Sequence, residues 1–482
     1  MLLVGTGRVP RGVSRHRGAR RAWVGGYRGY GTGVWSWVLR CVGSPTVARR
    51  GAWQNWGRNQ TCDPISIESP RSLLELCELV GSADRAGQRV RIAATGHSFS
   101  DIACTDSRML RIEALDRVID VDRDAMTITV EAGIRLFVLN DELAKRGLGL
   151  SNLGDIDKQT LAGALSTGTH GTSHRLGPIA AAVIGLELVT ANGDLVTCSP
   201  TEEPELFECA RIGLGVFGII TKVRLQCEPA FRLHSLEEPH EFEEALESWN
   251  SITANNDHVD SYWFPHSEVV TIKAANRTDR PIWVKSRQKQ WREEVLIGNY
   301  IFGGLAAYGR KRPSKVPSIA RMVASNMGRV EKVDVSHRVF CSPRLIRFVE
   351  MEYALPIEQM QATLRRIREL IESEKLQVDF PVEIRALPAD DIPLSMAHGR
   401  ETAFLAVHVS SGTPFEKYFR GVEAIMDEVE GRPHWGKMHF QTAEKLAPRY
   451  AEWGKFQKVR ATWDPEGRFA NAYTDRVLGP TK

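Results

Sequence analysis

A run of small residues constrains the fold of this chain more than any other feature. Between Ala162 and Thr172 nearly every residue is glycine, alanine, serine or threonine, with neither a strand-like nor a helix-like apolar period. A core helix needs more large side chains, and a surface loop usually holds more asparagine, aspartate, proline or lysine. The run therefore indicates a loop whose backbone lies flat against a large planar or phosphorylated ligand. A tight helix–strand contact is the alternative.

A second loop of small residues lies upstream. We expect a strand over Arg89–Ala94 that enters a tight turn at Thr95-Gly96, directly before His97 and Ser98. Such a turn lets backbone N–H groups approach an anionic group closely, and His97 can reach a cofactor bound there. No Gly-x-Gly-x-x-Gly motif opens a helix after this strand, so a nicotinamide cofactor is not expected.

Four further segments carry a family resemblance when they are read together with the two loops. They are Gly213–Thr221, Glu383-Ile384-Arg385, His408-Val409-Ser410 and Arg432–Lys437. The chain resembles the vanillyl-alcohol-oxidase-type flavoproteins, and specifically their aldonolactone oxidase branch. The matches run in order from about Trp53 to Gly479, and this collinearity is far more specific than any single motif.

The order of the expected elements predicts an α+β fold. Strands, helices and the Asn192-Gly193 hairpin turn follow one another without regular β-α-β alternation, and Ser69-Pro70 is expected to begin the first helix. The resemblance implies a two-domain molecule, with a PCMH-type FAD-binding fold and an α+β substrate (cap) domain. The expected extents are 1–52 for a basic extension, 53–229 for the FAD-binding domain, 230–430 for the cap domain, and 431–482 for a segment that returns to the flavin domain.

The resemblance implies FAD as the cofactor, attached through His97 to the 8α-methyl group of the flavin ring. A covalent link of this kind raises the flavin potential and eases hydride uptake. The family's usual Gly-Ser-Gly-His reads Ala94-Thr95-Gly96-His97 here, and Ala94 requires a negative φ. The implied FAD-binding residues are Ala94, Thr95, Gly96, His97, Ser98, Ser166, Gly168, Thr169, His170, Gly171, Thr172, Ile219 and Ile220.

The candidate substrate residues lie on two expected strands and in two loops. Glu383 and Arg385 alternate on one strand, so both side chains point to the same face. An exposed ion pair, which would contribute little, is the alternative. The resemblance implies a catalytic role for Glu383, Arg385, Lys437 and His408, and substrate contacts for Asp155 and Ser410.

The implied reaction is hydride transfer from a CH–OH carbon of a sugar lactone to flavin N5, with loss of the hydroxyl proton. The resemblance points to L-gulono-1,4-lactone or D-arabinono-1,4-lactone as the substrate class, and to O2 or another acceptor for the reduced flavin. An alditol oxidase acting on xylitol or sorbitol is the alternative, although Gly154–Asp157 resembles the lactone branch more. A non-catalytic flavoprotein is disfavoured by the intact Glu383, Arg385 and Lys437.

Charge argues against a nucleic-acid partner. The chain has 63 basic and 59 acidic side chains. Its first 62 residues hold eleven arginines and no acidic residue, so the remainder is mildly acidic. A fold that binds nucleic acid needs a basic face. We interpret residues 1–52 as an extension without a fold of its own.

Cysteine spacing and hydropathy indicate the cellular environment in which the protein is expected to work. The eight cysteines are scattered, without a C-x-x-C pair, which is typical of a reducing compartment and predicts a cytoplasmic protein. No apolar run is long enough for a transmembrane helix, although some relatives contact a membrane peripherally. His434 and His439 have no third ligand nearby in the sequence, so no metal site is expected.

Overall fold

The computed structural model describes residues 51–481 apart from 291, 293–295, 297–298 and 343. These residues belong to one compact unit, Arg49–Lys482. The predicted extension therefore lies outside the described residues except for its last two. The seven described cysteines are free thiols. None of the described helices is both long and apolar enough to cross a membrane.

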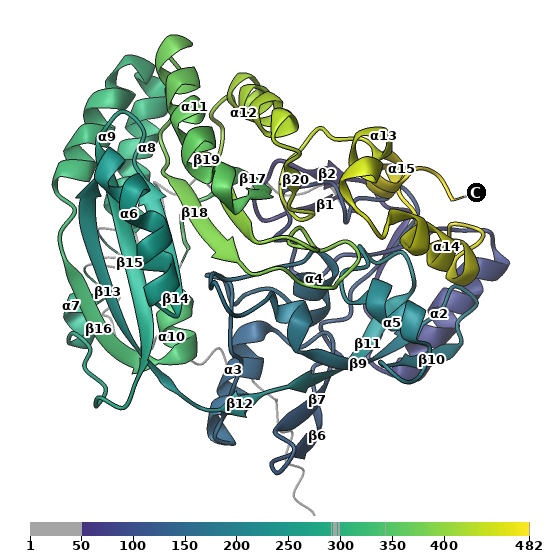
Figure 1. The fold of residues 1–482 in the computed structure, drawn as a ribbon. Coiled ribbons are helices and arrows are strands. Elements are labelled where there is room, and N and C mark those ends of the chain that lie inside the picture. Colours follow the sequence, from purple (N-terminus) through teal and green to yellow (C-terminus); the bar gives the residue numbers. More distant parts are fainter. Residues whose placement is uncertain (1–50, 291, 293–295, 297–298, 343, 482) are drawn as a thin grey trace, which may run out of the picture. The chain divides into compact units, whose positions relative to one another are not determined.

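The first part of the chain contains two main sheets (Figure 1). A three-stranded parallel sheet has the order β3-β5-β4 and holds the strand that precedes His97. A five-stranded antiparallel sheet has the order β10-β9-β11-β7-β6. The strand bounds are β1 Trp53–Gln54, β2 Thr61–Cys62, β3 Ser66–Glu68, β4 Val90–Ile92, β5 Arg108–Leu110, β6 Val118–Asp122, β7 Thr127–Glu131, β8 Leu148–Gly149, β9 Val183–Val189, β10 Leu195–Cys198, β11 Ile219–Gln226 and β12 Glu228–Pro229.

Two helix predictions in this part need correction. Helix α2 (Leu73–Arg85) begins after Ser72, whose hydroxyl accepts the Glu75 N–H, so Ser69-Pro70 does not cap it. The small-residue run begins with a short helix, α4 (Leu161–Ser166), capped by Thr160. The prediction of a loop from Ala162 is therefore wrong for the first half of the run, because small side chains let this helix pack tightly. The other helices here are α3 Leu136–Lys145 and α5 Pro204–Ala210.

The second part of the chain forms an eight-stranded sheet with the order β16-β13-β15-β14-β18-β19-β17-β20. Helices α6, α11 and α12 cover one face, where their apolar side chains join those of the strands in one core. The opposite face carries the polar side chains described below. The bounds are β13 Arg232–Glu241, α6 Phe242–Asn255, β14 His258–Trp263, β15 Val269–Thr278, α7 Arg287–Gln290, α8 Phe302–Lys311, α9 Val316–Ser325, β16 Val330–Val335, α10 Ser336–Phe340, β17 Phe348–Pro356, α11 Met360–Ser373, β18 Val382–Leu387, β19 Thr402–Ser410, α12 Glu416–Glu428 and β20 Arg432–Pro433.

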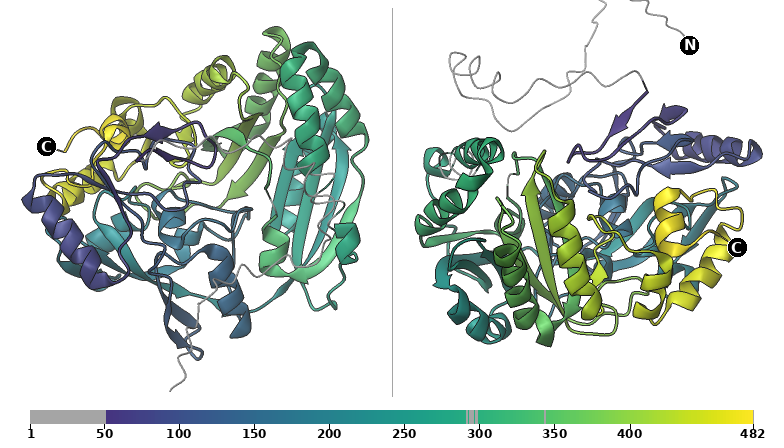
Figure 2. Two further views of the ribbon diagram at one scale, coloured as in Figure 1. Left: turned by 180° about the vertical axis from the view of Figure 1, so that it is seen from behind. Right: turned by 90° about the horizontal axis from the view of Figure 1, so that it is seen from above.

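The last helices pack against the first part of the chain. The Arg468 carbonyl accepts a hydrogen bond from Val90 of β4 at 2.7 Å, and the Arg468 guanidinium pairs with Asp84 of α2 at 2.8 Å. Figure 2 shows the C-terminal helices (yellow) beside the earliest described elements (purple). The helix bounds are α13 Ala443–Leu446, α14 Trp453–Trp463 and α15 Ala472–Leu478. The α+β prediction is confirmed, since helices accompany sheets that are mostly antiparallel.

Candidate active site

The predicted loop of residues 94–98 and helix α4 of the small-residue run line one groove. It holds about 860 Å³ of empty space, partly open to solvent. Residues 94–98 after β4 contribute one wall, Ser166 and Thr167 at the end of α4 another, and Ile219 and Ile220 of β11 a third. The structure therefore brings together Ala94, Thr95, Gly96, His97, Ser98, Ser166, Ile219 and Ile220 of the predicted FAD-binding residues.

The turn before His97 needs glycine at one position. Gly96 has a φ of +71°, and a Cβ there would lie 3.2 Å from the Trp53 ring. Ala94 is not among the residues with positive φ. The alanine that departs from the family's usual motif therefore introduces no backbone strain.

His97 lines this groove and has a ring nitrogen without a partner. Its Nδ1 is buried and has no hydrogen-bond partner among the described residues. Burial, aided by the positive charge of Lys437, lowers the pKa of His97 to about 4. The ring is therefore neutral at physiological pH, with an available lone pair. An orphaned, neutral imidazole in a groove between small-residue loops fits attachment to an electrophilic carbon of a bound cofactor.

The rest of the small-residue run lies apart from the groove lining. Thr169 accepts a hydrogen bond from Gln159 at 3.1 Å, and a Cβ at Gly168 would meet Met396 at 3.2 Å. Thr172 donates to the Val259 carbonyl of β14 at 2.6 Å. Gly171 and Thr172 instead line a small cavity that also contains Asp155 and Arg385. This half of the run connects the groove to the large sheet.

Glu383 and Arg385 lie on the same face of β18, as predicted. Arg385 pairs with Glu383 at 2.6 Å and with Asp260 at 2.7 Å, while Tyr262 donates to Glu383 at 2.6 Å. Both Glu383 and Arg385 are 6% exposed, so the alternative of an exposed ion pair is wrong. Burial raises the pKa of Glu383, and Arg385 opposes that effect.

Asp155 extends this charged group from the loop that follows β8. Its carboxylate lies 2.8 Å from Arg344 and 3.8 Å from Arg385. These two guanidinium groups, with Lys437, hold its pKa below the usual range although burial acts in the opposite direction. Sequence reasoning missed Arg344, Asp260 and Tyr262. Only the fold brings their strands and loops together.

Lys437 and His408 meet at a residue that the sequence interpretation missed, Glu350 of β17. Lys437 forms an ion pair with Glu350 Oε2, and His408 Nε2 lies 3.5 Å from Glu350 Oε1. Glu350, Glu383 and His408 have their potential ligand atoms within 4.8 Å of one another. Burial acts to raise the pKa of Glu350, but Lys437 and His408 lower it to about 2.

Ser410 makes a separate set of contacts at the end of β19. Its hydroxyl donates to Asp379 and accepts a hydrogen bond from Arg310 at 3.1 Å. The Ser410 hydroxyl, which was predicted to contact the substrate, is therefore hydrogen-bonded to protein side chains in this structure.

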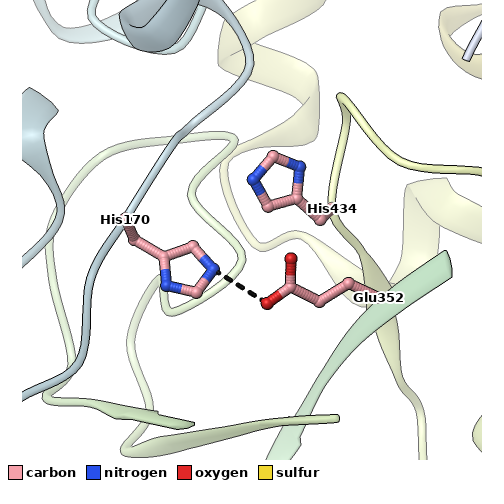
Figure 3. A group of neighbouring side chains, drawn as sticks. All are labelled: His170, Glu352 and His434. Atoms are coloured by element: carbon pink, nitrogen blue, oxygen red, sulfur yellow. Dashed lines mark ion pairs between the residues drawn. The ribbon is translucent and has the colours of Figure 1, made fainter. Parts of the chain in front are cut away.

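A second buried group joins the loop of residues 167–172 to β17. His170 Nε2 lies 3.3 Å from Glu352 Oε1, and His434 completes the group (Figure 3). His439 instead contacts the Tyr473 hydroxyl at 3.0 Å. The two histidines that are close in sequence therefore do not form a shared ligand pair.

Comparisons with known proteins agree with this architecture. Residues 223–477 match the family model described as D-arabinono-1,4-lactone oxidase, and residues 64–199 match an FAD binding domain. L-gulono-1,4-lactone dehydrogenase of Mycobacterium tuberculosis is 40% identical over 89% of this chain and 99% of its own length. L-gulonolactone oxidase of Bos taurus is 34% identical over 88% of this chain and 98% of its own length.

The fold also resembles that of a solved flavoenzyme. Cholesterol oxidase from B. sterolicum superposes with a TM-score of 0.75 at 18% identity, covering 90% of this chain and 99% of the other. At this identity the likeness concerns the fold alone. The resemblance found in the sequence is confirmed: the chain carries an FAD-binding domain and belongs to the D-arabinono-1,4-lactone oxidase family.

Proposed function

We propose that this protein is an FAD-dependent oxidoreductase that oxidises a CH–OH group of an aldono-1,4-lactone of the L-gulono or D-arabinono class. The observation that carries the proposal is a buried set of charged side chains from the large sheet next to the groove of His97. Phe99 N–H donates to the Gly436 carbonyl at 2.7 Å, and Lys437 Nζ lies 5.4 Å from the Phe99 ring centroid. The relatives' names support a lactone and lend no support to an alditol substrate.

FAD would occupy the groove, attached through His97. The free Nδ1 of this residue and the glycine turn before it support the attachment. Backbone N–H groups of residues 94–98 would hold the diphosphate without lysine. When bound, FAD supplies an acceptor for the hydride, and O2 or another acceptor takes the electrons onward.

The charged side chains would bind the substrate, accept its proton and orient one another. Arg385 and Asp155 would hold the lactone hydroxyls, since both line one small cavity and their charged groups lie 3.8 Å apart. His408 would take up the hydroxyl proton, and Glu350, which faces His408 and pairs with Lys437, would stabilise the charge that results. Glu383 would fix the orientation of Arg385 through their 2.6 Å pair. The free cysteines favour a cytoplasmic location.

Acid precipitation of the purified protein tests the cofactor assignment. We expect yellow flavin to stay in the pellet and to fluoresce on a denaturing gel. His97→Ala should release the flavin to the supernatant. Flavin in the supernatant of the unaltered protein would contradict the covalent link, and a folded protein without flavin would contradict the proposed function.

Substrate assays test the chemistry. We expect the protein to oxidise L-gulono-1,4-lactone or D-arabinono-1,4-lactone. Bleaching of the flavin absorbance measures the reaction in the absence of air, and reduction of a dye measures it in the presence of air. Oxidation of xylitol or sorbitol without lactone turnover would overturn the proposed substrate class.

A further inference from the structure

His258 shares a strand face with two residues of the charged group around Arg385. Side chains of β14 alternate between the two faces of the sheet, so His258, Asp260 and Tyr262 lie on one side. Asp260 pairs with Arg385 at 2.7 Å, and Tyr262 donates to Glu383 at 2.6 Å. His258 therefore continues this row toward the beginning of the strand.

A small cavity beside this row contains both proposed lactone-binding residues. Its lining includes His258, Asp155, Asp260, Lys273 and Arg385. The charged members already have protein partners at 2.7–2.9 Å. The free volume of about 10 Å³ is that of one water-sized group, so the cavity would admit a hydroxyl group of the lactone and exclude the ring.

One nitrogen of the His258 ring is held by the backbone. Nδ1 lies 2.8 Å from the Thr172 carbonyl, which can only accept, so Nδ1 carries a hydrogen. Burial lowers the pKa of His258, although this hydrogen bond and the nearby aspartates oppose the effect. The ring is therefore neutral at physiological pH, and its Nε2 is an acceptor.

The other nitrogen of the ring is left unpaired. Nε2 is buried and has no hydrogen-bond partner among the residues that the structure describes. The whole residue is 3% exposed. Buried polar atoms are nearly always hydrogen-bonded, because an unpaired one loses its water without compensation. An unpaired acceptor on a residue that lines the proposed substrate cavity therefore indicates a ligand group that donates a hydrogen bond.

Thr172 fixes the position of this ring relative to the sheet. Its hydroxyl donates to the Val259 carbonyl at 2.6 Å and accepts from the Ala386 N–H at 3.2 Å, which joins β14 to β18. Phe340 packs against the His258 ring at a centroid distance of 4.7 Å. The ring is thus ordered before a ligand binds, and this lowers the entropic cost of binding.

We propose that His258 Nε2 accepts a hydrogen bond from one hydroxyl group of the lactone, beside Asp155 and Arg385, and that His258 thereby selects lactones that carry this hydroxyl. A lactone without it leaves the buried Nε2 unpaired and binds more weakly. This assignment rests on the proposed function, because the substrate class comes from there.

Binding of L-gulono-1,4-lactone and D-arabinono-1,4-lactone to the dithionite-reduced holoenzyme tests the assignment, since reduced flavin cannot accept a hydride. His258→Asn keeps a donor for the Thr172 carbonyl and removes Nε2. We expect the Kd of the tighter lactone to rise about tenfold, the effect of one lost hydrogen bond. One mono-deoxy form of that lactone should bind the unaltered protein about tenfold more weakly, with no further loss in His258→Asn.

His234→Asn is the control for this measurement. His234 lies on β13 of the same sheet, and its ring contacts Glu331 at 2.7 Å away from the cavity. This variant should bind the lactone as the unaltered protein does. Equal Kd values for His258→Asn and the control would overturn the proposal.

Nitrogen NMR of histidine in the unaltered, reduced holoenzyme gives a measurement that does not depend on the stability of a variant. We expect the His258 ring to show a protonated Nδ1 and a bare Nε2, whose resonance moves when the lactone is added. An Nε2 resonance that stays in place with the lactone bound would overturn the proposal. Lactone binding without oxidation by the oxidised holoenzyme would refute only the proposed function, and absence of lactone binding would refute both.

Discussion

Each buried charge in the site has a partner of opposite sign. Glu350 faces Lys437, Asp155 faces Arg344, and Glu383 faces Arg385. Taking a charge out of water costs several kcal/mol, and only good geometry with a counter-charge offsets that cost. Removing one partner leaves the other charge buried and unpaired. Single substitutions here should therefore affect both stability and catalysis.

Replacing Arg385 with lysine should strongly reduce activity with the lactone, although the positive charge is kept. The guanidinium reaches Glu383, Asp260 and Asp155 together, and a single ammonium cannot reproduce that geometry. We expect kcat/KM with the lactone to fall by about 100-fold. Arg365→Lys is the control, since this arginine pairs with Glu243 at the surface, with side chains 38% and 56% exposed. Equal activity of the two variants would contradict a substrate role for Arg385.

The pair of His408 and Glu350 predicts a pH-dependent stability. Burial acts to lower the pKa of His408, but Glu350 raises it overall. Such a group stabilises the fold fully below its unfolded pKa of about 6.5 and loses that contribution as pH rises through the folded pKa. The loss of unfolding free energy in His408→Asn should be largest below about pH 6.5 and should decline toward alkaline pH. Urea unfolding at several pH values measures this, and a loss that grows with pH would contradict it.

Strand β17 explains why the sequence revealed only part of the site. In Phe348–Ala354, glutamates alternate with apolar residues, a pattern typical of a strand with one solvated face. The structure buries that face against loops that contain His170, His434 and Lys437, so Glu350 and Glu352 are each 3% exposed. Lys437 and His170 come from distant loops and His408 from the neighbouring strand β19, and periodicity cannot identify such partners. Two glutamates in an otherwise apolar strand were the available signal.

Local sequence patterns predicted where the small-residue segments lie, but they did not predict the backbone conformation of each segment. Gly96 and His97 could be identified because a positive φ and a close approach leave few residue choices at a tight turn. The helix at Leu161–Ser166 could not be identified from the sequence. Its apolar period is weak, and the helix is stabilised by tertiary packing, which the sequence pattern does not show. Strand β13 (Arg232–Glu241) was also missed, since its charged residues hide the alternation.

Two glycines with similar φ values allow the effect of backbone strain to be separated from the effect of a close contact at the turn before His97. Gly96 and Gly147 have φ values of +71° and +74°, but only a Cβ at Gly96 has a neighbour within 4 Å. Gly147→Ala should cost about 1 kcal/mol of stability from the left-handed conformation alone. Gly96→Ala should cost more and also lower the flavin content, because the Trp53 ring must shift. Flavin absorbance per protein and urea unfolding measure both effects, and unchanged flavin in Gly96→Ala would contradict this.

The fold brings together segments that lie far apart in the chain, and Arg91 forms hydrogen bonds to three of them. This buried side chain donates to the carbonyls of Ile102, Leu214 and Phe469 at 2.7–3.0 Å. Phe469 belongs to the C-terminal segment, and Leu214 precedes β11. Burial lowers the pKa of Arg91 to about 10, so its charge persists at physiological pH. Because Arg91 also lines the groove, the connection between these segments determines the shape of the proposed cofactor site.

Replacing Arg91 with lysine should therefore weaken the whole fold. Lysine can reach at most part of these carbonyls, and it leaves a strongly hydrated charge in the core. We expect the free energy of unfolding to fall by about 3 kcal/mol. Arg89→Lys is the control, because Arg89 also contacts the C-terminal segment, through Asp475 at 3.3 Å, but its side chain is 48% exposed. That variant should lose less than about 0.5 kcal/mol. Equal losses would show that a surface contact, and not the buried guanidinium, holds the C-terminal segment in place.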